Sequence, residues 1–138
     1  MSSVPAGLDL ALLHYPVLGK DGQVIGSAVT NLDLHDIARA AATYGVGRYY
    51  VATPFDDQRE LVDTIAGHWQ TGPGSRSNPA RRQAMALIRS IESLDQAVAD
   101  IAARNGSAMP LIVCTSARTG DKTISYQELR DRLGPKKQ

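Results

Sequence analysis

Residues 30–53 read TNLDLHDIARAAATYGVGRYYVAT, and this stretch decides the fold class. Short polar side chains at Asn31 and Asp33 are typical of a helix start, because they accept hydrogen bonds from the free N–H groups of the first turn. Apolar residues then recur at helical spacing as far as Gly45, which tolerates the positive φ of a helix end. The apolar run that follows predicts a strand, and Pro54 ends it because proline cannot continue a ladder.

Three further stretches contribute to the expected sheet. The apolar runs at residues 8–13 and 110–115 predict buried strands, and residues 24–29 fit either a short strand or an extended loop. Strand, helix and strand in succession form a βαβ unit with parallel strands. We therefore expect an α/β fold, a three-layer sandwich in which helices cover both faces of a mainly parallel sheet. Such sheets bind ligands beyond the carboxyl ends of their strands, which here are residues 14–15, 53–54 and 115–118.

Apolar residues also recur at helical spacing in the rest of the chain. Pro79 suits the first position of a helix, with Asn78 as its cap, and Ser93 is the expected cap of the helix that follows. The glycine- and proline-containing residues 71–78 before it predict a loop. The expected helices cover residues 56–69, 79–91, 93–105 and 125–133.

Composition limits the class of protein. The chain has 138 residues, of which 43 % are apolar and 21 % charged, and this is typical of one globular domain over residues 1–138. Fifteen Lys and Arg oppose fourteen Asp and Glu, so the net charge of +1 shows no domain-wide basic field. The single Cys114 excludes an internal disulfide, and the three histidines lack metal-ligand spacing, so we expect no metal site. No apolar run is long enough for a membrane span, and residues 1–13 lack signal-peptide features, so we expect a soluble, cytoplasmic protein.

The most informative charge feature is an absence of acidic residues. Between Asp63 and Glu92 there is none, although the stretch carries four arginines. Three of them share one arc of the helix expected from Pro79, and the fourth lies on the loop before it. Such a cationic face beside a helix N-terminus favours phosphate or RNA, and the alternative is an ordinary solvated helix face. The four are Arg76, Arg81, Arg82 and Arg89.

Three other positions are candidates for chemistry. His35 and Asp36 form either a base with its orienting carboxylate or a pair of solvent-facing first-turn residues. Arg39 forms either an ion pair with an acidic neighbour or part of a ligand site. Arg118 follows the last expected strand, where a guanidinium can meet a phosphate or a carboxylate. No Gly-x-Gly-x-x-Gly or phosphate-loop motif is present, which argues against the standard dinucleotide and nucleoside-triphosphate sites.

Several separated motifs resemble one protein family. Residues 30–46, followed by Tyr49-Tyr50-Val51, resemble the first motif of SPOUT-class RNA methyltransferases, in which an Asn precedes a helix carrying Ile-Ala-Arg, an aromatic-Gly-Val turn and a strand. With the other motifs, nearly the whole chain is similar to a small bacterial family predicted to be S-adenosylmethionine-dependent RNA methyltransferases of this class. Members are sometimes fused to a tRNA guanine methyltransferase. The other motifs are His14-Tyr15-Pro16, His68-Trp69, Asn78-Pro79 with Arg81, and Thr115-Ser116-Ala117-Arg118.

The resemblance implies a fold and an activity. The fold is a SPOUT-like three-layer α/β domain with a C-terminal trefoil knot that holds the cofactor S-adenosyl-L-methionine, and the protein acts as a homodimer on RNA, with tRNA as the first candidate. Arg39 and Asn31 carry over as candidate catalytic residues, and Arg39 also as a candidate for RNA phosphate binding. Arg118 carries over as a candidate RNA contact, beside His35 and the four arginines.

The sequence departs from the family after Leu133. The family continues there into an apolar strand, a glycine-rich segment and the knot, whereas this sequence ends at Gln138. We therefore expect the knot to be absent and this chain alone to bind S-adenosylmethionine weakly or not at all. Three interpretations stay open: a member of the RNA methyltransferase lineage, a non-catalytic RNA-binding or scaffold domain derived from it, and an incomplete fragment.

Overall fold

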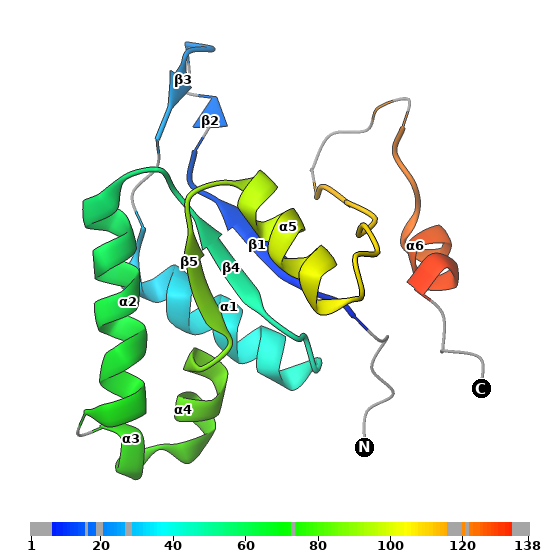
Figure 1. Ribbon diagram of the computed structural model, residues 1–138. Coiled ribbons are helices and arrows are strands. Elements are labelled where there is room, and N and C mark those ends of the chain that lie inside the picture. Colours follow the sequence, from blue (N-terminus) through cyan, green and yellow to red (C-terminus); the bar gives the residue numbers. More distant parts are fainter. Residues whose placement is uncertain are drawn as a thin grey trace.

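The computed structural model describes residues 7–15, 17–18, 21–26, 29–72, 74–115, 120 and 122–133. Its main sheet has three parallel strands in the order β1-β4-β5 (Figure 1). They are β1 (Leu10–Leu13), β4 (Tyr49–Ala52) and β5 (Ile88–Ile91). The predicted α/β class and the parallel pairing of the first two strands are confirmed.

Helix α1 (Asn31–Thr43) forms the crossover between β1 and β4, as predicted. Its cap differs from the expectation, because the side chain that accepts the Asp33 N–H, at 3.1 Å, is Thr30 Oγ1. Thr30 has an extended backbone, which points its hydroxyl at the first turn, whereas Asn31 and Asp33 are already helical. Gly45 ends the helix region with a φ of 71°, as expected for a residue without Cβ.

The alternating side chains of β4 join the two helical layers. Tyr49 and Val51 pack in a cluster with α1, α2 (Asp56–Thr71) and α4 (Pro79–Met85). Tyr50 and Ala52 pack on the other face with α5 (Leu94–Arg104). All four side chains are buried because β4 is the central strand, with helices on both faces (Figure 1). The three-layer prediction is therefore confirmed, and so are the caps Asn78 and Ser93, whose side chains accept from Arg81 N and Gln96 N.

The helix expected over residues 79–91 is wrong in its second half. Helix α4 ends at Met85, and residues 88–91 form the third strand of the sheet. Backbone bonds from Tyr49 N to Leu87 O and from Thr53 N to Ile91 O, at 2.9 and 3.0 Å, pair β5 with the central strand. This pairing buries Ile88 and Ile91 on opposite faces, which outweighs their agreement with a helical period.

The strand expected at residues 110–115 is also wrong, because no ladder pairing forms there and β5 is the third strand instead. Leu111, Ile112 and Val113 are between 43 % and 66 % exposed, and Cys114 is exposed rather than in the core. Apolar, β-branched composition favours a strand, but a strand forms only against a partner edge. Composition alone could not show that residues 110–115 have no partner strand within the part of the chain that the structure describes.

Smaller elements complete the described part. Residues 24–29, which fitted either a strand or a loop, contribute β3 (Val24–Ile25), and it pairs with β2 (Val17–Leu18). The expected loop at 71–78 contains a single helical turn, α3 (Gly74–Ser77). Helix α6 (Tyr126–Leu133) follows Ser125 as predicted and lies outside the two helical layers (Figure 1). Among the described helices, none is both long and apolar enough to cross a membrane.

Candidate functional site

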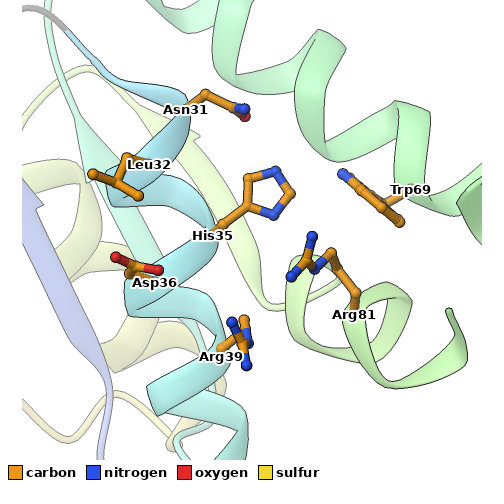
Figure 2. A pocket seen from close by; sticks show the side chains of 7 residues that line it. All are labelled: Asn31, Leu32, His35, Asp36, Arg39, Trp69 and Arg81. Atoms are coloured by element: carbon orange, nitrogen blue, oxygen red, sulfur yellow. The ribbon is translucent and has the colours of Figure 1, made fainter.

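A pocket of about 600 Å³ opens between three helices on one face of the sheet. Helix α1 supplies most of its wall, and α2 and α4 supply one side chain each (Figure 2). Five of the residues expected to take part in function meet here: Asn31, His35, Asp36, Arg39 and Arg81. The complete lining is Asn31, Leu32, His35, Asp36, Arg39, Trp69 and Arg81.

The spacing along α1 explains why its residues reach one pocket. Asn31, His35 and Arg39 are four residues apart, so they lie along one face of the helix. Leu34 and Ala38 lie on the adjacent face of the helix and are fully buried in the core. Burial of this apolar face fixes the rotation of α1, and that rotation directs the polar residues into the pocket.

Arg81 reaches the pocket from the first turn of α4. Its backbone N–H donates to the Asn78 side chain at 3.1 Å, which fixes the start of that helix. Its guanidinium carbon lies 5.4 Å from the centre of the Trp69 ring, a cation–π contact with α2. Gln70 Nε2 also donates to Arg82 O at 2.9 Å, so a second contact joins α2 to α4.

The imidazole of His35 lies between the other groups. It meets Trp69 edge-on, with ring centres 5.6 Å apart (Figure 2). Its Nδ1 is buried and has no hydrogen-bond partner among the described residues. Burial is the largest cause that lowers the pKa of His35 below 6.5; Arg81 and Arg39 lower it further, and Asp36 opposes them. His35 is therefore neutral at pH 7.

The proposed pairing of His35 with Asp36 is not formed. No hydrogen bond between the two side chains occurs in the described structure. Adjacent helical residues point in different directions, so an orienting carboxylate at the next position has poor geometry. Asp36 lines the pocket and acts on His35 through its charge alone.

The pocket favours an anion. Within the described residues, neither Arg39 nor Arg81 has an ion-pair partner within 4 Å, so the expected alternative of an ion pair for Arg39 is not formed. Two guanidiniums and one carboxylate leave an excess of positive charge, while the neutral His35 adds none. Guanidinium groups bind phosphate and carboxylate oxygens through charge-assisted hydrogen bonds.

The pocket does not fit the methyl donor that the resemblance implies. S-adenosylmethionine carries a sulfonium cation, which the two guanidiniums of Arg39 and Arg81 would repel. No glycine is among the lining residues, so every lining position carries a side chain that keeps an adenosine away from the backbone. Elsewhere, no cluster of three His, Cys, Asp or Glu that could hold a metal ion occurs among the described residues.

The remaining candidates do not line the pocket. Arg76 on α3 and Arg82 on α4 are exposed. Arg89 lies on β5 rather than on the helical arc expected for it, because the helix ends before it, and its Nη1 donates to Ala86 O and Ile88 O at 2.7 and 2.8 Å. Arg118 lies outside the described residues.

Sequence reasoning did not single out two of the pocket residues, Leu32 and Trp69, and Trp69 is the one that meets the charged groups. Its helical spacing placed it with the apolar residues of α2, and it does pack against the core cluster. It is only half-buried, however, and its ring meets Arg81 and His35 in the pocket. The usable signal was a single tryptophan next to a histidine in a segment rich in arginine.

The sequence of the chain is similar to one family of known proteins. A family model described as "SAM-dependent RNA methyltransferase" matches residues 7–138. A "tRNA (guanine-N(1)-)-methyltransferase" of Nitratidesulfovibrio vulgaris is 49 % identical over 108 residues, 78 % of this chain and 25 % of the relative. A protein of the same name from Oleidesulfovibrio alaskensis is 41 % identical over 126 residues, 91 % of this chain and 29 % of the relative. An uncharacterized protein of Aquifex aeolicus is 40 % identical over 124 residues, 90 % of this chain and 60 % of the relative.

The family match and the relatives differ in how much of each protein they cover. The chain spans between a quarter and a third of the two methyltransferases that carry a name. The family match, in contrast, covers almost every residue, including the pocket helices α1, α2 and α4. The chain therefore belongs to the S-adenosylmethionine-dependent RNA methyltransferase family.

Proposed function

We propose that this chain takes part in S-adenosylmethionine-dependent methylation of RNA and that the pocket between α1, α2 and α4 holds part of the RNA. The observation that carries this proposal is the meeting of Arg39 and Arg81, from two helices, without an ion-pair partner among the described residues. RNA offers a phosphate at every nucleotide, and phosphate is the natural partner of paired guanidiniums.

Three pocket residues of α1 have a proposed role. Arg39 binds a phosphate of the RNA and acts at the reacting nucleotide, and Asn31, two turns earlier on the same helix face, orients that nucleotide through its amide. His35 stays neutral and offers its unpartnered Nδ1 to the same nucleotide. The site of S-adenosyl-L-methionine lies outside this pocket.

A wider surface guides the RNA to the pocket. Arg82 is exposed on α4, the helix that carries Arg81, and Arg76 is exposed on α3, which precedes it; Arg89 and Arg118 are further candidate contacts. The segment from Thr64 to Ile91 has no acidic residue to oppose them. In this proposal the RNA is a tRNA, and the SPOUT-like domain formed by residues 1–138 acts as a homodimer in the cytoplasm.

A methyl-transfer assay tests the proposal. The protein is incubated with tRNA and S-adenosylmethionine labelled in its methyl group, and label is counted in the RNA. The proposal requires label in RNA with the wild type and with Arg130→Ala, which alters an exposed arginine of α6, and none with Arg39→Ala. Label with the wild type would also overturn the expectation, drawn from the sequence, that this chain alone binds S-adenosylmethionine weakly or not at all. If the wild type binds tRNA but transfers no label, the chain is an RNA-binding domain rather than a methyltransferase. If Arg39→Ala binds tRNA and transfers label as the wild type does, the proposed site is wrong.

A further inference from the structure

Trp69 is the point where the three pocket helices meet. It is the single tryptophan of the chain. Its ring centre lies 5.4 Å from the guanidinium carbon of Arg81 on α4 and 5.6 Å from the ring centre of His35 on α1. His68, its neighbour on α2, meets it edge-on at 5.5 Å. The indole therefore contacts both Arg81 and His35, and Trp69 and Arg81 face α1 across the pocket (Figure 2).

Two buried polar atoms of this cluster lack a partner. Arg81 Nε and His35 Nδ1 are both shielded from solvent, and neither has a hydrogen-bond partner among the described residues. Leaving a buried donor unpaired is unfavourable, so such atoms are normally paired in native proteins or reserved for a ligand. A group with several acceptor oxygens, placed between Arg81 and Arg39, would satisfy the Arg81 donor and balance both charges.

The shape and contents of the pocket narrow the ligand class. A volume of about 600 Å³ accommodates a single nucleotide. The pocket lies between helices, so a nucleotide can enter only when it is extruded from a stack. Asp36 at its edge adds an acceptor, which suits a base with N–H donors more than a second phosphate.

We infer that Arg81 is an RNA-binding residue that holds one phosphate opposite Arg39, and that Trp69 is its positioning residue, so that the pocket takes one unstacked nucleotide of single-stranded RNA. This inference rests on the proposed function, since it specifies how the RNA of that reaction is held. The cation–π contact restricts the guanidinium to one orientation before RNA arrives, which reduces the entropy lost on binding.

The tryptophan itself provides the first test. Because Trp69 is the single tryptophan, its fluorescence reports the pocket and no other surface. We expect a six-nucleotide single-stranded RNA to change this fluorescence with the same midpoint that anisotropy of a labelled copy gives. Anisotropy that shows binding while tryptophan fluorescence stays constant at saturation would overturn the inference, because the RNA would then bind elsewhere.

A double-mutant cycle supplies the second test, with anisotropy of the labelled hexamer as the measurement. Arg81→Ala should weaken binding by about 10- to 100-fold, the value of a charge-assisted contact. Trp69→Phe, which keeps an aromatic ring but weakens the cation–π contact, should weaken binding by about two- to fivefold. In the Arg81→Ala background, Trp69→Phe should have no further effect. An equal effect of Trp69→Phe in both backgrounds would show a merely structural role and overturn the positioning assignment.

Two further variants complete the binding test, and a comparison of Arg81→Ala with Arg39→Ala separates this inference from the proposed function. Arg81→Lys keeps the charge but loses the planar fork, and it should recover only part of the lost affinity. Arg130→Ala on α6 is the matched control and should bind as the wild type. If Arg81→Ala binds RNA normally while Arg39→Ala abolishes methyl transfer, the inference fails and the proposed function stands. If the wild type neither binds nor methylates RNA, the proposed function itself fails.

Discussion

Thr30→Ala should loosen the pocket at the first turn of α1. Thr30 Oγ1 is the side-chain cap of this helix and accepts the Asp33 N–H at 3.1 Å, immediately before the pocket residue Asn31. Loss of an N-cap costs about 1 kcal/mol, which corresponds to a decrease of about 4 °C in Tm for a domain of this size. Since 1 kcal/mol is a factor of about five in an equilibrium constant, local opening of the first turn should become about five times more frequent.

Amide hydrogen exchange followed by NMR measures this opening residue by residue. Under conditions in which local opening governs exchange, the Asp33 amide should exchange about five times faster in Thr30→Ala than in the wild type. Ser93→Ala is the matched control, because Ser93 caps α5 through Gln96 N at 3.2 Å on the other face of the sheet. Ser93→Ala should lower Tm by a similar amount and leave the exchange rate of the Asp33 amide unchanged. Equal exchange at Asp33 in all three proteins would refute the assignment of Thr30 as the cap.

Three other predictions concern the titration of His35, the hydroxyl of Tyr50 and the exposed arginines Arg76 and Arg82. The pKa of His35 is lowered below 6.5, mainly by burial. Its neutral form therefore stabilises the fold above pH 6.5, and this contribution is lost as pH falls through the lowered pKa. NMR titration of its ring protons should give a midpoint below 6.5, and this midpoint should rise when the RNA hexamer binds. Tyr50→Phe removes the hydroxyl that accepts from Arg104 Nη2 at 2.8 Å, so urea denaturation should show a loss of about 1 kcal/mol, while RNA affinity stays unchanged because the bond lies on the α5 face. Replacing both Arg76 and Arg82 by alanine should reduce the slope of log affinity for single-stranded RNA against log salt by about 1.4, and an unchanged slope would show a merely solvated face.

The α5 face explains why stability and RNA binding should respond separately. Arg48 and Arg104 form ion pairs with Asp100 and Asp9, and Tyr50 donates to Asp100. This network lies across the sheet from the pocket, since Tyr50 and Trp69 belong to different clusters. A change in the network therefore tests the fold without touching the proposed RNA site.

Local patterns predicted the helix starts and the two strands around α1 well. Asn78 and Ser93 cap their helices as expected, because a cap depends on a side chain and a backbone N–H only three residues away. Residues 86–91 were misassigned because Leu87, Ile88 and Ile91 fit a helix and a buried strand equally well. The choice depends on pairing with β4, almost forty residues earlier in the chain.

The pocket shows the same division between local and distant causes. The four-residue spacing of Asn31, His35 and Arg39 puts them on one face of α1, but only the structure shows that this face lines a pocket. The arginines after residue 75 were recognised as a group, but only Arg81 among them lines the pocket, and Arg89 is part of a strand. The residues at the predicted strand ends, such as Thr53, do not line the pocket either.

The sequence by itself determined the α/β class, the family, the amphipathic α1 and the excess of arginine, because these depend on residue types and on spacings of a few residues. Only the tertiary structure decided which of two apolar stretches joins the sheet, and that Trp69 meets Arg81 and His35. The physical reason is that pairing and helix packing join residues far apart in the chain. Their energies depend on which partner surface is available, and a local pattern does not contain that information.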